Sequence, residues 1–331
     1  TIQQSNNPTI QQSNNPTIRL ESMKNDRALK ILFIRQYKRR TGGHVTVRDY
    51  FMHSLKHPRL EPFVYFSPDS DMASNDLWRH VDRARFVDEV NVDDYDMFFV
   101  GGDDWKYLPE DMQGKKVINA ILHVRHGKRK SLRALLKNPA FRICNSKEVR
   151  QAILPAANGP AVTIHNAVDF EIFKTSDEKK TNSVLIWGQK NTHLASFIFE
   201  ALQARGDCAV DLQIESIPRE AFAAKLQKTD VFVPLPNKTE GFYRPSLEGM
   251  ASRCAVVCSD AKGNRNHCID GETCLQPKFD NADSHLEKIN LLLTEPHLKE
   301  KIRDLGWRKA QEFSLETQRA KYYEFLEKEV F

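Results

Sequence analysis

The feature that most limits the possible folds is a regular alternation of short apolar runs with longer amphipathic segments. Each apolar run has the length and composition of a buried strand. The runs are KILFIRQ (30–36), PFVYF (62–66), YDMFFVGG (95–102), KVINAIL (116–122), FRICNS (141–146), VTIHN (162–166), VLIWG (184–188), VDLQIES (210–216), VFVPLP (231–236) and AVVCSD (255–260). Strands that alternate with helices in this way are typical of α/β folds with parallel sheets.

A polar stretch, TSDEKKTNS at 175–183, separates the first six runs from the last four. The sequence therefore predicts two doubly wound, Rossmann-like domains that face each other across a cleft. We place the N-terminal domain at residues 24–170 and the C-terminal domain at 171–310. Residues 311–331 are predicted to form a final helix that packs back on the first domain.

The first 23 residues differ in character from the rest. PTIQQSNN occupies 8–15, and the same segment without its proline occupies 1–7. Polar low-complexity sequence of this kind is typical of disorder, so residues 1–23 are predicted to be a disordered leader outside the fold.

Composition bears on where the protein works. No run reaches the roughly 18 apolar residues of a membrane span, and no apolar signal core opens the chain. None of the six cysteines belongs to a CxxC pair, so we expect reduced thiols in a cytoplasmic protein. Cys254, Cys258, His267 and Cys268 do not have a common zinc spacing, and buried structural thiols are the favoured interpretation.

Charge is distributed unevenly along the chain. Residues 24–165 hold 25 Lys and Arg against 17 Asp and Glu, including RQYKRR at 35–40 and RHGKRK at 125–130. A basic N-terminal half suits an anionic partner, such as phosphate, an acidic glycan or the inner face of a membrane. A solvated basic face is the alternative for either cluster. Nucleic acid is not expected, because no recognisable module or interleaved aromatic pattern accompanies the charge.

The most informative segment begins with EGFYRPSLEGM at 240–250. It follows the strand-like run VFVPLP, and Pro245 suits the first turn of a short helix. A helix N-terminus in this place can bind a diphosphate through its free amides. Glu240 in the loop and Glu248 on the helix could each accept hydrogen bonds from sugar or ribose hydroxyls. The segment therefore predicts a site for a nucleotide sugar.

This segment resembles the donor-site signature of glycosyltransferase family 4 and its GT-B relatives. The resemblance implies that Glu240 contacts the transferred sugar and is catalytic, and that Glu248 holds the ribose. It also implies donor contacts from the loop and the first helical turn, made by Gly241, Phe242, Tyr243, Arg244, Ser246 and Leu247. Chance spacing of two surface glutamates is the alternative, and the length of the matching string argues against it.

Other motifs follow in the order that the family shows. ICNSKEVRQAI (143–153), IHNAVDFEIF (164–173) and VLIWGQKN (184–191) resemble its interdomain and second-domain units. In the last of these, Lys190 is expected to neutralise the leaving diphosphate, and Gln189 stands where the family often has arginine. Gly42 and Gly43 of TGGH resemble the glycine-rich loop that lets backbone approach a ligand, although a plain helix entry is the alternative.

Two histidines and two aspartates follow strands of the first domain. His123 and His126 come after KVINAIL, where the family has a histidine near the reacting carbon, and the sequence does not decide between them. Asp103 and Asp104 follow YDMFFVGG and could accept hydrogen bonds from acceptor hydroxyls, with helix capping as the alternative.

The resemblance implies a retaining, metal-independent hexosyl- or deoxyhexosyltransferase with no cofactor. Its donor would be a nucleoside diphosphate sugar, and its acceptor a glycan or lipid-linked hydroxyl in surface polysaccharide biosynthesis. Peripheral attachment at the inner face of the membrane would suit the basic first domain. A non-catalytic nucleotide-sugar-binding subunit and a nucleotide-sugar epimerase of the same fold are the alternatives.

Overall fold

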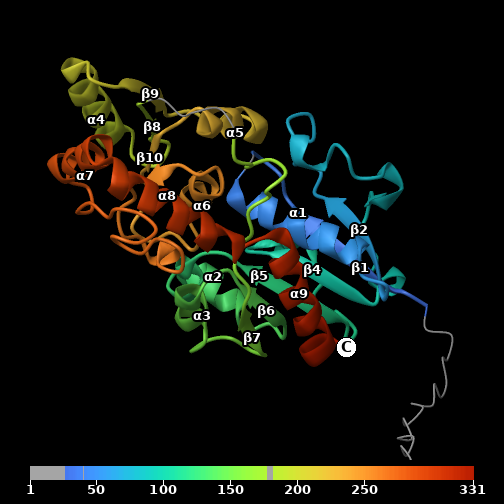
Figure 1. The fold of residues 1–331 in the computed structure, drawn as a ribbon. Helices are drawn as coiled ribbons and strands as arrows, with labels where there is room; N and C mark the ends of the chain where they lie inside the picture. Colours follow the sequence, from blue (N-terminus) through green and yellow to red (C-terminus); the bar gives the residue numbers. More distant parts are fainter. Residues whose placement is uncertain (1–26, 40, 177–181) are drawn as a thin grey trace, which may run out of the picture.

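The computed structural model describes residues 27–39, 41–176 and 182–331. The predicted leader and the middle of the polar stretch 175–183 lie outside these residues. The described chain forms two lobes, each built on a parallel sheet (Figure 1).

The first sheet has seven strands in the order β3-β2-β1-β4-β5-β6-β7, all parallel. Its strands are β1 (Leu29–Arg35), β2 (Leu60–Phe66), β3 (Phe86–Val87), β4 (Met97–Gly101), β5 (Lys116–Ile121), β6 (Phe141–Cys144) and β7 (Ala161–Thr163). All six apolar runs of the first domain overlap a strand, while β3 was not predicted.

Alternate side chains of β1 enter different cores. Ile31 and Phe33 pack with helix α1 (Gly42–Leu55), whereas Leu32 and Ile34 face the opposite side of the sheet. Since strand side chains alternate between faces, a strand that is apolar at every position must be covered on both. The other α-helices between the strands of this lobe are α2 (Lys130–Leu135) and α3 (Lys147–Ile153).

The second sheet has four parallel strands in the order β11-β10-β8-β9. Its strands are β8 (Ser183–Trp187), β9 (Ala209–Gln213), β10 (Val231–Pro234) and β11 (Ala255–Val256). The run predicted at 255–260 is paired over only two residues of β11, after which Val257 makes an isolated bridge with Leu275.

Helices cover both faces of the second sheet. They are α4 (Thr192–Arg205), α5 (Arg219–Gln227), α6 (Arg244–Ala251), α7 (Ala282–Thr294) and α8 (Pro296–Gln311). Gly206 ends α4 in the left-handed conformation at φ 65°, which glycine adopts without strain. Pro218 is the N-cap residue of α5, and Pro296 starts α8.

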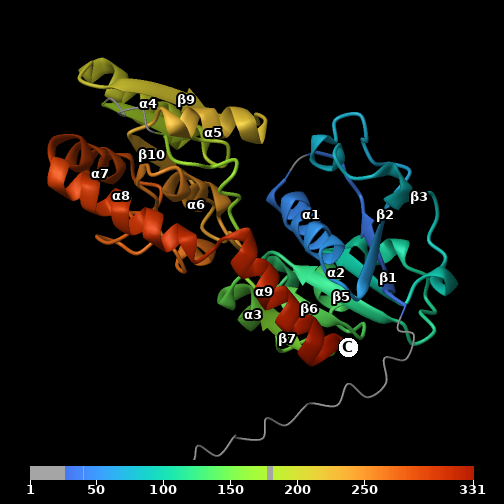
Figure 2. The same cartoon turned by 45° about the vertical axis from the view of Figure 1, so that its right-hand side comes forward.

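Helix α9 (Leu315–Phe325) returns from the second lobe to the first (Figure 2). Tyr322 and Phe325 belong to the apolar core that α1 forms with the first sheet. The Tyr322 ring lies 5.0 Å from the Tyr50 ring, edge to face. Helix α9 therefore packs on the first lobe through buried side chains, while the predicted domain boundaries stay predictions.

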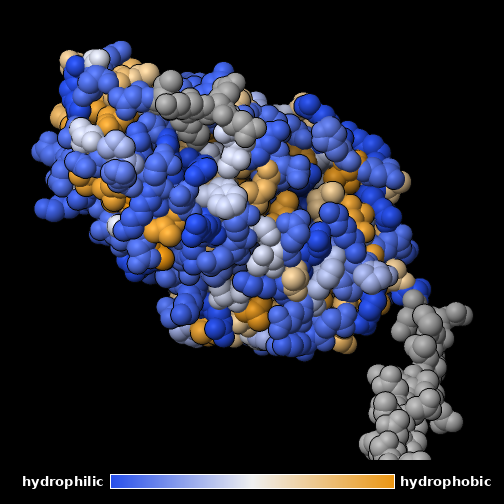
Figure 3. Space-filling view, in the orientation of Figure 1, coloured by the Kyte–Doolittle hydropathy of each residue, from blue (hydrophilic) through white to orange (hydrophobic). Residues whose placement is uncertain are grey.

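The surface in Figure 3 is mainly hydrophilic, with small separate hydrophobic patches. Within the described ranges, no helix is long and apolar enough to cross a membrane.

Candidate functional site

A cavity of about 400 Å³ lies where the two lobes meet. It opens at the carboxyl ends of β8 and β10, neighbouring strands whose onward connections run to opposite sides of the sheet. Ligands of open α/β sheets bind at such a point. The residues that line it are Arg39, Thr41, Gly42, Val45, Phe173, Trp187, Gln189, Lys190, Ser216, Ile217, Arg219, Phe222, Glu240, Phe242, Tyr243, Arg244, Pro245 and Glu248.

Two helix N-termini contribute to this cavity. Thr41 and Gly42 begin α1, and Arg244 and Pro245 begin α6. The ends are close, since a β carbon placed on Gly42 would lie 3.8 Å from Arg244 Cδ. Each N-terminus carries a partial positive charge, so the cavity favours an anion.

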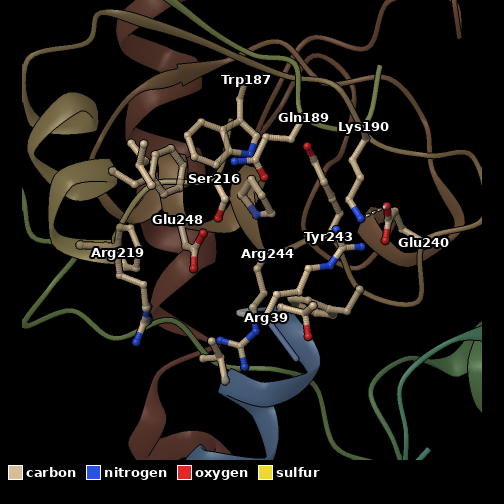
Figure 4. Close-up of a pocket in the computed structure, with 18 residues that line it drawn as sticks. Arg39, Trp187, Gln189, Lys190, Ser216, Arg219, Glu240, Tyr243, Arg244 and Glu248 are labelled. Atoms are coloured by element: carbon tan, nitrogen blue, oxygen red, sulfur yellow. Dashed lines mark ion pairs between the residues drawn. The ribbon is translucent and has the colours of Figure 1, made fainter. Parts of the chain in front are cut away.

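Two carboxylates border the cavity on opposite sides (Figure 4). Glu240 Oε1 accepts a hydrogen bond from Asn237 Nδ2 at 3.2 Å and lies 3.8 Å from Lys190 Nζ. Glu248 lies on the second turn of α6 and is 8% exposed. The glutamates could therefore accept hydrogen bonds from hydroxyls at two ends of one ligand.

Tyr243 places a phenol between these carboxylates. The ring is buried, and its hydroxyl has no hydrogen-bond partner among the described residues. Burial raises the pKa of Tyr243 well above 10, and the charges of Glu240 and Glu248 act in the same direction. The phenol therefore keeps its proton and can donate a hydrogen bond.

The second lobe also supplies an apolar wall that the sequence did not single out. The Trp187 and Phe222 rings stack at 4.0 Å, and the Arg219 guanidinium lies 5.3 Å from the centre of the Phe173 ring. Together with Arg39, Arg219 adds positive charge at the cavity. Their positions in the sequence could have indicated both residues, because Trp187 ends the strand β8 and Arg219 begins the helix after β9.

Arg244 is a predicted donor ligand, and that role stays a prediction. Its guanidinium turns toward the first lobe, where it donates to Asp49 Oδ2 at 2.9 Å and to the Ala167 carbonyl at 2.7 Å. Both members of the ion pair are buried. The side chain is therefore engaged between the lobes, although its aliphatic part still lines the cavity.

Glycine at 241 lets the Glu240 loop lie against the first lobe. A β carbon there would be 2.0 Å from the Leu122 carbonyl oxygen and 3.0 Å from His123 Cα. On the other side, a β carbon on Gly263 would approach the Gly241 carbonyl carbon to 2.3 Å. The backbone at Gly241 is therefore enclosed by both lobes. A larger residue at this position would require the surrounding backbone to move.

The two candidate histidines lie in different surroundings. His123 is half-buried next to the Glu240 loop, and its Nδ1 accepts a hydrogen bond from the Arg125 amide at 3.1 Å. That bond places the proton of the neutral ring on Nε2. Burial lowers the pKa of His123, as do the charges of Arg125 and Lys190.

His126 is buried behind Gly102, whose β carbon would lie 3.7 Å from the ring. Burial lowers its pKa to about 4, with further lowering by Arg125 and His123. Neither histidine lines the 400 Å³ cavity. The backbone at Gly241 lies against His123, so His123 is the one next to the Glu240 loop, and both catalytic roles stay predictions.

The aspartates do not lie in this cavity either. Asp104 is buried in an ion pair with Arg35 and accepts a hydrogen bond from the Gln36 amide at 3.3 Å, and its acceptor contact stays a prediction. Burial raises its pKa to about 6, against the lowering by Arg35. Asp103 instead borders a separate cavity of about 820 Å³ that Trp105 and Leu132 also line.

The remaining predicted residues fall into two groups. Gln189, Phe242 and Gly42 line the cavity. Gly43, Ser246 and Leu247 do not: the Ser246 hydroxyl donates to the Tyr243 carbonyl at 2.9 Å, and Leu247 is in the core. Any donor contact of Ser246 or Leu247 would be through backbone amides, and it stays a prediction.

The cysteines are all unbridged, and Cys208 alone is not fully buried. In the part of the chain that the structure describes, no three His, Cys, Asp or Glu side chains gather as metal ligands.

Comparison with known proteins places this geometry in context. Residues 170–308 match the family model of glycosyl transferases group 1. The match contains both glutamates, Lys190 and the whole of α6. No curated protein matches the sequence.

Solved structures resemble the chain over nearly its whole length. Anabaena Alr3699/HepE in complex with UDP-glucose aligns with a TM-score of 0.72 and 14% identity, covering 90% of this chain and 99% of that one. A glycosyltransferase from Rickettsia africae aligns at 0.68 with 13% identity and coverage of 91% and 98%. Sucrose-phosphate synthase from Thermosynechococcus elongatus aligns at 0.68 with 13% identity and coverage of 90% and 98%. The chain therefore has the GT-B fold.

Proposed function

We propose that this protein transfers a hexosyl or deoxyhexosyl group from a nucleoside diphosphate sugar to a hydroxyl of a glycan or lipid-linked acceptor. One observation carries the proposal: Glu240 and Glu248 lie on either side of the α6 N-terminus in a cavity between the lobes. The match to glycosyl transferases group 1 supports it. So does the likeness to Alr3699/HepE, which binds UDP-glucose.

In the proposed complex the diphosphate lies at the N-termini of α6 and α1, where amides and helix dipoles offset its charge. Glu248 accepts hydrogen bonds from the ribose, and Glu240 from the sugar. Lys190 is 47% exposed and 3.8 Å from Glu240, so its mobile ammonium can reach a phosphate oxygen. Arg39 and Arg219 add charge at the same cavity.

In the transfer step, the bond between the anomeric carbon and the phosphate oxygen breaks. A bond to the acceptor oxygen forms, and the hydroxyl proton passes to the departing diphosphate. Stabilisation of developing negative charge by fixed donors lowers the barrier. Neutral His123, with its proton on Nε2, donates a hydrogen bond to an oxygen of the sugar or phosphate. We further propose retention of configuration, no metal requirement and a role in surface polysaccharide synthesis at an anionic membrane surface.

Turnover of a panel of nucleoside diphosphate sugars, with UDP-glucose first, tests the proposal through release of the nucleoside diphosphate. We expect one donor to be consumed, and Glu240→Gln to lower kcat by about 100-fold through lost transition-state stabilisation. Donor binding without turnover would instead support a non-catalytic subunit. Conversion of the donor to an epimer without acceptor would support an epimerase.

A further inference from the structure

A third cavity, of about 270 Å³ and smaller than the 400 Å³ cavity of the proposed donor site, lies beside the Glu240 loop. Its residues are His123, Val124, Arg125, Lys128, Arg129 and Thr239. Five of them belong to the connection from β5 to α2, which contains the 3-10 helix η5 (Val124–Gly127), and Thr239 comes from the second lobe. The volume is near the lower limit of ligand-sized pockets, roughly 300 Å³.

The lining is cationic and contains no carboxylate. Among the residues that the structure describes, none of Arg125, Lys128 and Arg129 lies within ion-pair distance of an acid. By contrast, Lys190, one of the cations that line the 400 Å³ cavity, has Glu240 beside it. Three uncompensated positive charges around one concave site attract an anion.

This site is adjacent to the place where the sugar would be transferred. Thr239 immediately precedes Glu240, and the backbone at Gly241 lies directly against Leu122 and His123. Burial lowers the pKa of His123, and the charges of Arg125 and Lys190 lower it further, so this ring is close to a cation of each cavity. A group bound in the smaller cavity would therefore lie next to Glu240.

We propose that the smaller cavity binds an anionic group of the acceptor, best matched by a phosphate, and holds the attacking hydroxyl next to the donor sugar. The inference rests on the proposed transferase function. A dianionic phosphate matches three cations better than a single negative charge does, and arginine can bind it through two parallel hydrogen bonds. The phosphate could belong to a soluble sugar phosphate or to a lipid headgroup.

Arginine modification by phenylglyoxal, measured residue by residue by mass spectrometry, tests the site directly. The full chain is first saturated with the nucleoside diphosphate that stabilises it most, so that the larger cavity is filled. Glucose 6-phosphate at about four times its Kd should then slow modification of Arg125 and Arg129 roughly fivefold. Glucose should not. Arg133, exposed on α2 outside the lining, is the internal control.

The Lys128→Ala variant should raise the glucose 6-phosphate concentration needed for this protection by about tenfold, because it removes a charge-assisted contact. Arg133→Ala should leave that concentration unchanged. Equal protection of Arg125, Arg129 and Arg133, equal protection by glucose, or no protection would overturn the proposal.

Phosphatidylcholine vesicles with and without phosphatidic acid distinguish the sources of the phosphate. Protection at a lower phosphate concentration with the acidic vesicles than with glucose 6-phosphate indicates a lipid headgroup, and the reverse order indicates a soluble sugar phosphate.

Failure of the proposed transferase function would appear separately, as no donor turnover. The modification experiment can then be run without nucleotide and still reports whether the three cations bind phosphate.

Discussion

At the scale of single residues, burial sets the protonation of the groups around the cavity. Tyr243 keeps its proton, and His123 and His126 have pKa values below 6.5. The two histidines should contribute differently to catalysis, because His123 lies against the Glu240 loop and His126 lies behind Gly102.

We therefore expect His123→Ala to lower kcat/KM for the donor by about tenfold, as for loss of one hydrogen bond to a charged or polarised group. His126→Gln should change kcat/KM less, since its ring is buried behind Gly102 and not beside the Glu240 loop. Steady-state kinetics of the two variants checks this order. A larger loss for His126→Gln, with an unchanged melting temperature, would reverse the assignment.

The buried histidines also predict how stability depends on pH. Burial lowers the pKa of His165 to about 4, so the unfolded chain binds a proton at this site below pH 6.5 that the folded chain does not. Stability is therefore lost as pH falls from 6.5 toward 4, by up to about 1.4 kcal/mol per pH unit for each such group.

His165→Gln should accordingly become more stable relative to the unmodified protein as the pH falls through this window. Thermal unfolding at several pH values measures the difference, with the exposed His297→Gln as control. A difference that does not vary with pH would show that His165 is not held neutral.

At the scale of elements, the loop before α6 depends on close backbone contact. Gly241→Ala would place a methyl group 2.0 Å from the Leu122 carbonyl oxygen, so the loop must move away from the first lobe. We expect a lower melting temperature and a large loss of donor turnover. Gly42→Ala is the matched steric control, because its β carbon has 3.8 Å of space and alanine favours the helix by about 1 kcal/mol. Equal melting temperatures for the two variants would contradict this explanation.

Elements with continuous apolar runs could be predicted from the sequence, because a strand buried on both faces has a clear pattern. β1 and β5 were placed within one residue at each end. The two-residue strand β3 has no such run. Its existence depends on pairing with β2, which is a tertiary contact.

The predicted site shows the same difference between local sequence patterns and tertiary contacts. The segment from Glu240 to Glu248 could be placed from its local pattern, because a strand, a loop and a helix start follow one another in the chain. The pairing of Asp104 with Arg35 and of Arg244 with Asp49 joins residues far apart in sequence, so no local pattern indicates it. Arg39 lines the cavity because of how the two lobes meet, and the spacing of residues in the sequence does not determine that arrangement.

At the scale of the whole molecule, the buried pair between Arg244 and Asp49 joins the lobes at the edge of the cavity. Removing one partner leaves an uncompensated buried charge, which typically destabilises by about 3–5 kcal/mol. We expect Arg244→Ala and Asp49→Ala each to lower the melting temperature strongly, and the double variant to lose less than their sum.

A double-mutant cycle read by thermal unfolding measures this coupling. The exposed pair of Arg205 and Asp207 is the control, for which about 0.5 kcal/mol or less is expected. Additive effects at Arg244 and Asp49 would show that the pair does not couple the lobes.

Binding of the nucleoside diphosphate by isothermal titration calorimetry tests most directly whether the α6 N-terminus and Glu248 hold the donor. We predict that the protein binds the diphosphate of its donor base, and that Glu248→Gln raises the Kd about tenfold or more through loss of ribose hydrogen bonds. Glu272→Gln, an exposed change in the same lobe, should leave the Kd unchanged. An unaltered Kd in Glu248→Gln, or no binding of any nucleoside diphosphate, would contradict the account.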